Sequence, residues 1–267
     1  MSKRIVLIWI VSMLLSACGA SDTWEDEEVH EVSHRIMADD VRADWSVAEL
    51  QTPSSDKMKI IRLTIGRQDG SAIDEFDVTH DKMLHLIVVS DDLSYFDHIH
   101  PEYLGGGVFE IEHEFPQGGE YQLIADFKPV DGDATTKSQR VRIAGRQTQS
   151  VPIVPDGSLE QNADGIRVNL AIDQLTPRQD ATLKFSMTDV KSGKPITDLQ
   201  PYLGAIGHVV ILSDDGERYL HVHAEEDQGT GPDAVFETQF PRSGVYKIWG
   251  QFQHNDQVIT VPYVVKV

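Results

Sequence analysis

The sequence has a single cysteine, Cys18, so neither a disulfide within the chain nor a thiolate metal site is expected. Basic residues are also few, with 23 Lys and Arg against 43 Asp and Glu and a formal charge of −20. A surface of this sign repels nucleic acid and anionic lipid, so nucleic acid is not expected as a partner. No Gly-x-Ser-x-Gly nucleophile motif, Walker loop or Gly-x-Gly-x-x-Gly fingerprint occurs. We therefore expect a protein that is not an enzyme.

Long hydrophobic runs are missing except near the start, where two basic residues precede the apolar run Ile5–Leu15. This pattern is typical of a secretory signal peptide, expected over residues 1–17. The segment Leu15–Gly19 resembles the lipobox of bacterial lipoproteins, in which the signal is cleaved before a cysteine whose thiol receives a lipid such as palmitate. The resemblance implies lipidation at Cys18, with the lipid as membrane anchor on the outer face of a membrane in the cell envelope. The alternative is an uncleaved apolar anchor.

An acidic spacer is expected over residues 18–44, and beyond it the chain has short β-type runs separated by turn residues. The runs form two sets, which predict an all-β chain of two tandem immunoglobulin-like sandwiches at residues 45–147 and 159–267. The segment 148–158, rich in Pro, Ser, Gly and Asp, is the expected linker. The predicted strands are Lys59–Ile65, Leu84–Ser90, Tyr95–His100, Val108–Phe115, Glu120–Phe127, Arg140–Ala144, Ile166–Ile172, Thr182–Thr188, His208–Ser213, Tyr219–Ala224, Val235–Phe240, Val245–Phe252 and Val258–Val267.

The two sets are copies of each other. With an offset of 123 residues, Gly70–His100 aligns without a gap on Gly193–His223, and eight positions are identical. These positions are Gly70, Ile73, His85, Ser90, Asp91, Asp92, His98 and His100. Each set also has a Gly-x-Tyr that opens a late strand, at Tyr121 and Tyr246, and that resembles the tyrosine corner of immunoglobulin-like domains. A duplicated sandwich is the simplest interpretation.

Three histidines in each repeat are predicted to share one face of a hairpin. A strand that begins at His85 and one that ends at His100 flank an Asp-Asp-Leu-Ser turn. A hairpin centred on this turn places His85 opposite His100 and Ile87 opposite His98, and strand alternation then brings the imidazoles together. A register slip of one residue would separate them.

The second repeat gives the same prediction, with His208 opposite His223 and Val210 opposite His221. Three imidazoles without a thiolate suit Cu(II) or Zn(II), so we expect one copper or zinc site in each repeat. Met83 shares the strand parity of His85, and its thioether would favour Cu(I) in the first site, although Met83 also fits an ordinary core position. The histidines without an assigned role are His30 and His34 in the spacer, His80, His113 and His254.

The segments from His85 to Pro101 and from Pro201 to His223 resemble a motif of exported bacterial β-sandwich proteins, the FixH/YtkA-like immunoglobulin-type domains. The resemblance covers most of both repeats, although Ala224 stands where the first repeat has Pro101. It implies a non-enzymatic envelope protein and copper binding.

Two functions remain open. The first is a surface-tethered lipoprotein that binds copper or zinc through the three-histidine sites, for sequestration or relay. The second is a structural or interaction module, or an accessory subunit of a membrane complex, whose partner is a membrane or envelope protein. In that case the histidines are buried hydrogen-bonding residues. Rings that face one another would favour the first function, and rings bonded to backbone would favour the second.

Overall fold

The computed structural model describes residues 35–50, 57–147, 149–225 and 227–267, apart from the side chains of His221 and His223. The expected signal peptide and the expected lipidation site at Cys18 lie outside these residues. Within the described part of the chain, no helix is both long enough and apolar enough to cross a bilayer.

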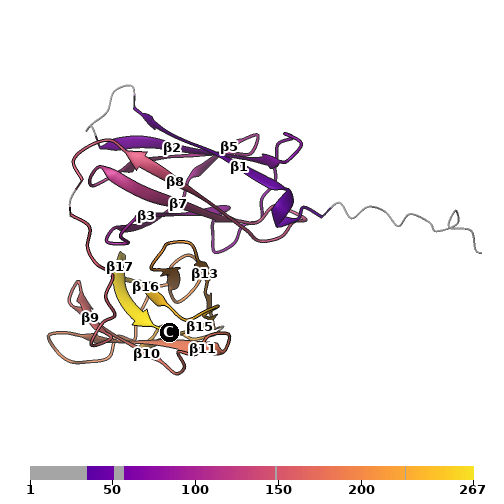
Figure 1. Ribbon diagram of the computed structural model, residues 1–267. Helices are drawn as coiled ribbons and strands as arrows, with labels where there is room; N and C mark the ends of the chain where they lie inside the picture. The colour runs from indigo at the N-terminus through magenta and orange to yellow at the C-terminus, as the bar shows by residue number, and fades with distance from the viewer. Residues whose placement is uncertain (1–34, 51–56, 148, 226) are drawn as a thin grey trace, which may run out of the picture. The chain divides into compact units, whose positions relative to one another are not determined.

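The first repeat is a sandwich of two antiparallel four-stranded sheets, ordered β1-β2-β6-β5 and β4-β3-β7-β8 (Figure 1). Leu86 and Val88 of β3, Leu63 of β2 and Leu123 of β7 are among the buried side chains between the sheets. The elements are the short 3₁₀ helix η1 (Ala38–Asp40) and the strands β1 (Val41–Glu49), β2 (Met58–Arg67), β3 (Leu84–Ser90), β4 (Phe96–Ile99), β5 (Glu102–Gly105), β6 (Val108–Glu114), β7 (Gly119–Phe127) and β8 (Thr135–Ile143).

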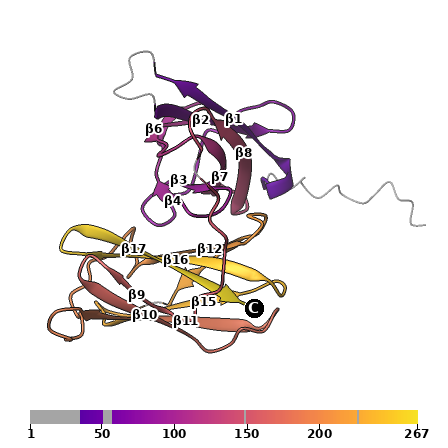
Figure 2. The same ribbon diagram turned by 60° about the vertical axis from the view of Figure 1, so that its left-hand side comes forward.

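The second repeat has the same two-layer design, with sheets ordered β14-β15-β11-β10-β9 and β13-β12-β16-β17 (Figure 2). Phe185, Phe236, Phe252 and Tyr263 fill the space between its layers. Its strands are β9 (Glu160–Ala163), β10 (Ile166–Ile172), β11 (Asp180–Asp189), β12 (His208–Ser213), β13 (Tyr219–His221), β14 (His223–Ala224), β15 (Asp233–Gln239), β16 (Val245–His254) and β17 (Gln257–Lys266). The chain is therefore all-β, with two tandem immunoglobulin-like sandwiches.

The tyrosine corners predicted from the two Gly-x-Tyr segments are confirmed. The Tyr121 hydroxyl donates a hydrogen bond to the Gln117 carbonyl at 3.0 Å, and the Tyr246 hydroxyl donates to the Arg242 carbonyl at 2.9 Å. Each bond reaches four residues upstream, so each ties the start of a late strand to the loop before it.

The first sandwich begins earlier than the expected boundary at residue 45. Ile36 and Val41 are buried in its core, and Ile36 forms a bridge with Gly132, so residues 35–44 belong to the fold and not to a solvated spacer. Strand β1 alternates polar and inward-facing apolar residues, the pattern of an outer strand, but residues 41–44 fall within the segment predicted as an acidic spacer. The expected linker contains no strand in its described residues.

A third apolar cluster joins the two sandwiches and explains why both faces of β3 are apolar. The face with Leu86 and Val88 covers the core of the first sandwich, and the face with Ile87 and Val89 covers the second repeat. The Phe96 ring also stacks on Trp249, with 4.7 Å between the centroids. The cluster consists of Ile87, Val89, Leu93 and Ile124 from the first repeat and Val210, Leu212 and Trp249 from the second.

Candidate metal centre

The hairpin that presents the first histidine trio has the predicted register. Cα pairing places Ile87 opposite His98 and Leu86 opposite Ile99. The turn is held by Asp92, whose carboxylate accepts hydrogen bonds from the Ser90 and Ser94 hydroxyls at 2.7 Å each. Because β4 ends at Ile99, His100 comes directly after the strand end, beside the first residues of β3.

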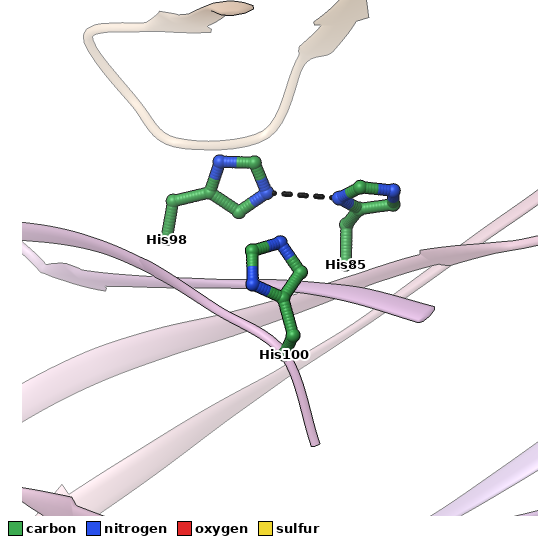
Figure 3. A group of neighbouring side chains, drawn as sticks. All are labelled: His85, His98 and His100. Carbon is green, nitrogen blue, oxygen red and sulfur yellow. Dashed lines mark hydrogen bonds between the residues drawn. The ribbon is translucent and has the colours of Figure 1, made fainter. Parts of the chain in front are cut away.

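His85, His98 and His100, the histidine trio, converge on one point. One ring nitrogen of each residue lies within 4.8 Å of the corresponding nitrogens of the other two. The ring centroids are 5.2 Å apart for His85 and His98, 5.1 Å for His85 and His100, and 4.8 Å for His98 and His100. Figure 3 shows the His100 ring turned toward the gap between the other two rings. Two imidazoles on one tetrahedral metal ion have centroids roughly 5 Å apart, so the trio has the spacing of a metal site.

Two members of the trio, His85 and His98, also have the outer hydrogen bonds expected of metal-bound histidines. His98 Nδ1 contacts Gln251 Oε1 at 2.8 Å, and His85 Nε2 contacts the Thr79 carbonyl oxygen at 2.9 Å. Both partners are acceptors, so each of these ring nitrogens carries a hydrogen. Ligating imidazoles usually donate their second N–H to a carbonyl or carboxylate in this way, which fixes the tautomer and leaves the other nitrogen for the metal.

The remaining nitrogens of these two rings face each other, with His85 Nδ1 at 3.0 Å from His98 Nε2. If both outer nitrogens donate, neutral rings bring two lone pairs together here, and a positive charge between them is needed, carried by an extra proton or by a metal ion. His85 and His98 are only 6% and 8% exposed, and burial disfavours the extra proton. Two nitrogens that each lie 2.0–2.1 Å from one metal ion are roughly 2.9–3.4 Å apart.

His100 adds an unsatisfied polar atom to the same place. Its Nε2 is buried and has no hydrogen-bond partner among the described residues. A buried ring nitrogen without a partner is costly unless a ligand satisfies it. Burial and the neighbouring histidines lower the pKa of both His98 and His100 to about 3, so these rings are neutral, the form that binds metal.

The second repeat does not form an equal site in the predicted way. Cα pairing places Val210 opposite His221, as expected, but His223 pairs with Glu237 on the other sheet, so its predicted pairing with His208 is wrong. The chain crosses from β13 to β14 between these two histidines, and this sheet change was not visible in the strand pattern. The His208 ring instead lies near the trio of the first repeat, with its centroid 5.9 Å from that of His98.

Sequence reasoning missed the outer partners of the trio, Gln251 and Thr79. Both come from segments far along the chain or outside the strands, so no local pattern marks them. The offset of 125 residues that relates Tyr121 to Tyr246 does pair Gln251 with Asp126, which lies opposite His85. Met83 precedes β3 and is 38% exposed, more than any member of the trio, and its role as a ligand stays a prediction.

One sequence feature outside the described residues bears on the expectation that this protein is not an enzyme. The residues from His30 to His34 spell His-Glu-x-x-His, the pattern that binds zinc and supplies a general base on a metalloprotease helix. The motif lies in the segment 18–44 that the sequence predicts to be an acidic spacer. That expectation therefore stays a prediction.

A protein-family model described as a domain of unknown function (DUF8832) matches this chain twice, at residues 36–145 and 161–267. The chain belongs to the DUF8832 family. The two DUF8832 matches coincide with the two sandwiches, and the first begins at Ile36, where the structure also places the start of the fold.

Solved structures with similarity to this DUF8832 chain are β-domain proteins, and their TM-scores are low. The Escherichia coli adhesin FdeC is 16% identical over 84% of this chain, with a TM-score of 0.26, and the match covers 63% of the FdeC chain, less than two thirds of its length. Domains 4 and 5 of the S-layer protein SbsC are 13% identical over 85% of this chain and 96% of their own, with a TM-score of 0.24. Two fibronectin type III domains of chicken tenascin are 12% identical over 84% of this chain and 98% of their own, also at 0.24. No match is found among curated proteins.

Proposed function

We propose that this protein binds one copper or zinc ion through His85, His98 and His100, for sequestration or relay of the metal. The observation that carries the proposal is that the two ring nitrogens of His85, and those of His98, face different kinds of partner. The outer nitrogens of His85 and His98 face protein acceptors, and their inner nitrogens face each other 3.0 Å apart, beside His100. This is the arrangement that a metal ion uses, and neutral rings do not satisfy it while both outer nitrogens donate.

The donor set narrows the choice of metal. Three neutral imidazoles without a thiolate suit Cu(II) or Zn(II), and three protein ligands leave a fourth position open. A Cu(I) ion would need a softer ligand, and Met83 remains the candidate for that role. A second ion held by His208, His221 and His223 loses support because His223 lies on the other sheet.

The proposed setting is the outer face of a membrane in the cell envelope, with a lipid on Cys18 as the anchor. The lipobox-like segment supports this, as does the resemblance to FixH/YtkA-like domains. The proposal includes no nucleic-acid partner, because the chain has a net charge of −20.

A second candidate function, a structural module, has a specific observation in its favour. If the Gln251 amide turns over, Thr260 donates to its oxygen and its nitrogen donates to His98 Nδ1, and His98 Nε2 then donates to His85. His85 Nε2 still donates to Thr79, so neutral groups satisfy every bond in this chain. The histidines would then serve to link the two sandwiches, with a membrane or envelope protein as the partner.

The His100→Ala substitution separates the two functions. It removes a proposed ligand and leaves the bonds of His85 and His98 intact. We expect the full-length chain to bind about one equivalent of Cu(II) or Zn(II) by titration calorimetry and metal analysis, and the variant to bind at least tenfold more weakly with little change in stability. His254→Ala, whose ring contacts Asp198 instead, is the matched control and should bind as the wild type does. Unchanged metal uptake in His100→Ala would overturn the metal function.

A further inference from the structure

His208 lies close to the trio although it belongs to the second repeat. It is the first residue of β12, and its Cα partner on β16 is Gln251, the residue that contacts His98 Nδ1. Its ring is stacked at 26° to the His85 ring, with 6.0 Å between centroids, and is 5.9 Å from the His98 ring. One pair of neighbouring strands in the second repeat, β12 and β16, therefore brings both a hydrogen-bond acceptor and an imidazole to the site.

The His208 ring is about one ångström farther from the rings of the trio than those rings are from one another. The three rings of the trio have centroids 4.8–5.2 Å apart, whereas His208 is 5.9 and 6.0 Å from two of them. Its Nε2 is 3.4 Å from the Leu203 carbonyl oxygen, a long and weak contact. The ring would have to move by about one ångström to reach the distance that the trio already has.

We infer that His208 supplies the fourth ligand when the trio binds its ion, so that the two repeats share one four-imidazole site. This inference rests on the proposed metal function. It gives the fourth coordination position, which structural zinc sites fill with protein ligands, to a residue whose ring lies next to the trio. Burial and the nearby His98 and His80 lower the pKa of His208 to about 3, so this ring too is neutral and able to bind.

His80 is the competing ligand and also supplies the control. Its ring is 4.9 Å from that of His208 and 6.0 Å from that of His85, and it is exposed at the edge of a cavity of about 600 Å³. His80 has a positive φ of 50° in a turn, whereas His208 begins a paired strand next to Gln251. Ligands on a rigid strand hold metal geometry better than ligands on a turn, which favours His208.

The test counts imidazoles on Zn(II) bound to the full-length chain by X-ray absorption, and compares Zn(II) affinities of variants. We expect four imidazoles in the wild type, three in His208→Ala, and at least a tenfold loss of affinity in that variant, while His80→Ala retains both values. His208→Gln, which keeps most of the side-chain volume, should lose affinity in the same way if His208→Ala folds poorly.

Each outcome bears on one of the two proposals. Three imidazoles with an oxygen ligand in the wild type, or full affinity in both His208 variants, would overturn the fourth ligand and leave the trio in place. If His80→Ala loses an imidazole and the His208 variants do not, His80 is the fourth ligand. A wild-type chain that takes up neither Zn(II) nor Cu(II) would overturn the fourth ligand together with the metal function.

Discussion

The side-chain amide of Gln251 determines which nitrogen of His98 is available to a metal. With its oxygen toward His98 Nδ1, the amide makes that nitrogen a donor and leaves Nε2 with a lone pair. With its nitrogen there, Nε2 carries the hydrogen and faces His85 as a donor. Gln251 is 5% exposed, so water does not take over its role.

Substitutions of Gln251 test this role directly. Gln251→Glu can only accept as a carboxylate, so it should keep His98 in the metal-binding tautomer and retain Zn(II) affinity within a few-fold. Gln251→Leu removes the acceptor and should weaken Zn(II) binding about 10–100-fold, as the loss of an outer-shell partner does. It should also lower the free energy of unfolding by about 1–3 kcal/mol, because His98 Nδ1 is left unsatisfied. Titration calorimetry and urea denaturation measure both. Equal affinities for the two variants would contradict the tautomer argument.

His98 also makes the stability of the metal-free chain depend on pH. Burial lowers its folded-state pKa to about 3, against 6.5 unfolded, so below pH 6.5 the unfolded state binds a proton that the folded state does not. Stability is therefore complete above pH 6.5 and falls as the pH drops from 6.5 toward 3. Between pH 7 and pH 5 the loss from His98 is about 2 kcal/mol.

Urea denaturation of the chelator-treated chain at pH 7 and pH 5 measures this loss. His98→Gln is the control, because it lacks the titrating ring and should lose less stability over the same interval. A wild-type stability that is equal at both pH values would show that His98 takes up its proton without unfolding.

At the scale of elements, the sequence pattern correctly predicts the bounds of the strand that carries His85 and the register of its hairpin. β3 and β12 have the predicted bounds because each is an apolar run with turn residues after it, and the turn around Asp92 fixes the pairing of Ile87 with His98. The register is set by local chemistry, since the Asp92 carboxylate binds the serines on either side of the turn.

Contacts between strands of different sheets could not be predicted in the same way. The run Tyr219–Ala224 reads as one strand, but it divides at Val222, and the part after it joins β15 in the other sheet. The sequence also could not predict to which side of the sheet the three imidazoles point, because both faces of β3 are apolar. Only the packing of the second repeat against Ile87 and Val89 decides it, and that packing depends on residues more than a hundred positions away.

At the scale of the whole molecule, the two repeats pack through corresponding surfaces. Ile87 and Val89 align with Val210 and Leu212 in the offset between repeats, and all four lie in the cluster between the sandwiches. The same patch thus faces its own copy, as it does across the interface of a symmetric homodimer. This explains how a histidine of one repeat comes to lie beside the trio of the other.

Trp249 tests whether this packing makes the two sandwiches unfold together. It is 3% exposed, stacks on Phe96 and lies beneath the Lys247 ammonium group, which donates to the Leu93 carbonyl at 2.8 Å. Trp249→Ala should lower the free energy of unfolding by about 3–5 kcal/mol. Because that loss falls on the contact between the repeats, calorimetry should change from one transition to two. Zn(II) affinity should fall with it, since β16 also carries Gln251.

Trp45→Ala is the control for this experiment, because Trp45 packs against the core of the first sandwich. It should lower the unfolding temperature and leave Zn(II) binding unchanged, with no new transition caused by the loss of contact between the repeats. If Trp249→Ala melts in two transitions but keeps wild-type Zn(II) affinity, the contact between the sandwiches is dispensable to the site. The trio would then have to bind metal within the first repeat, without Gln251 and His208.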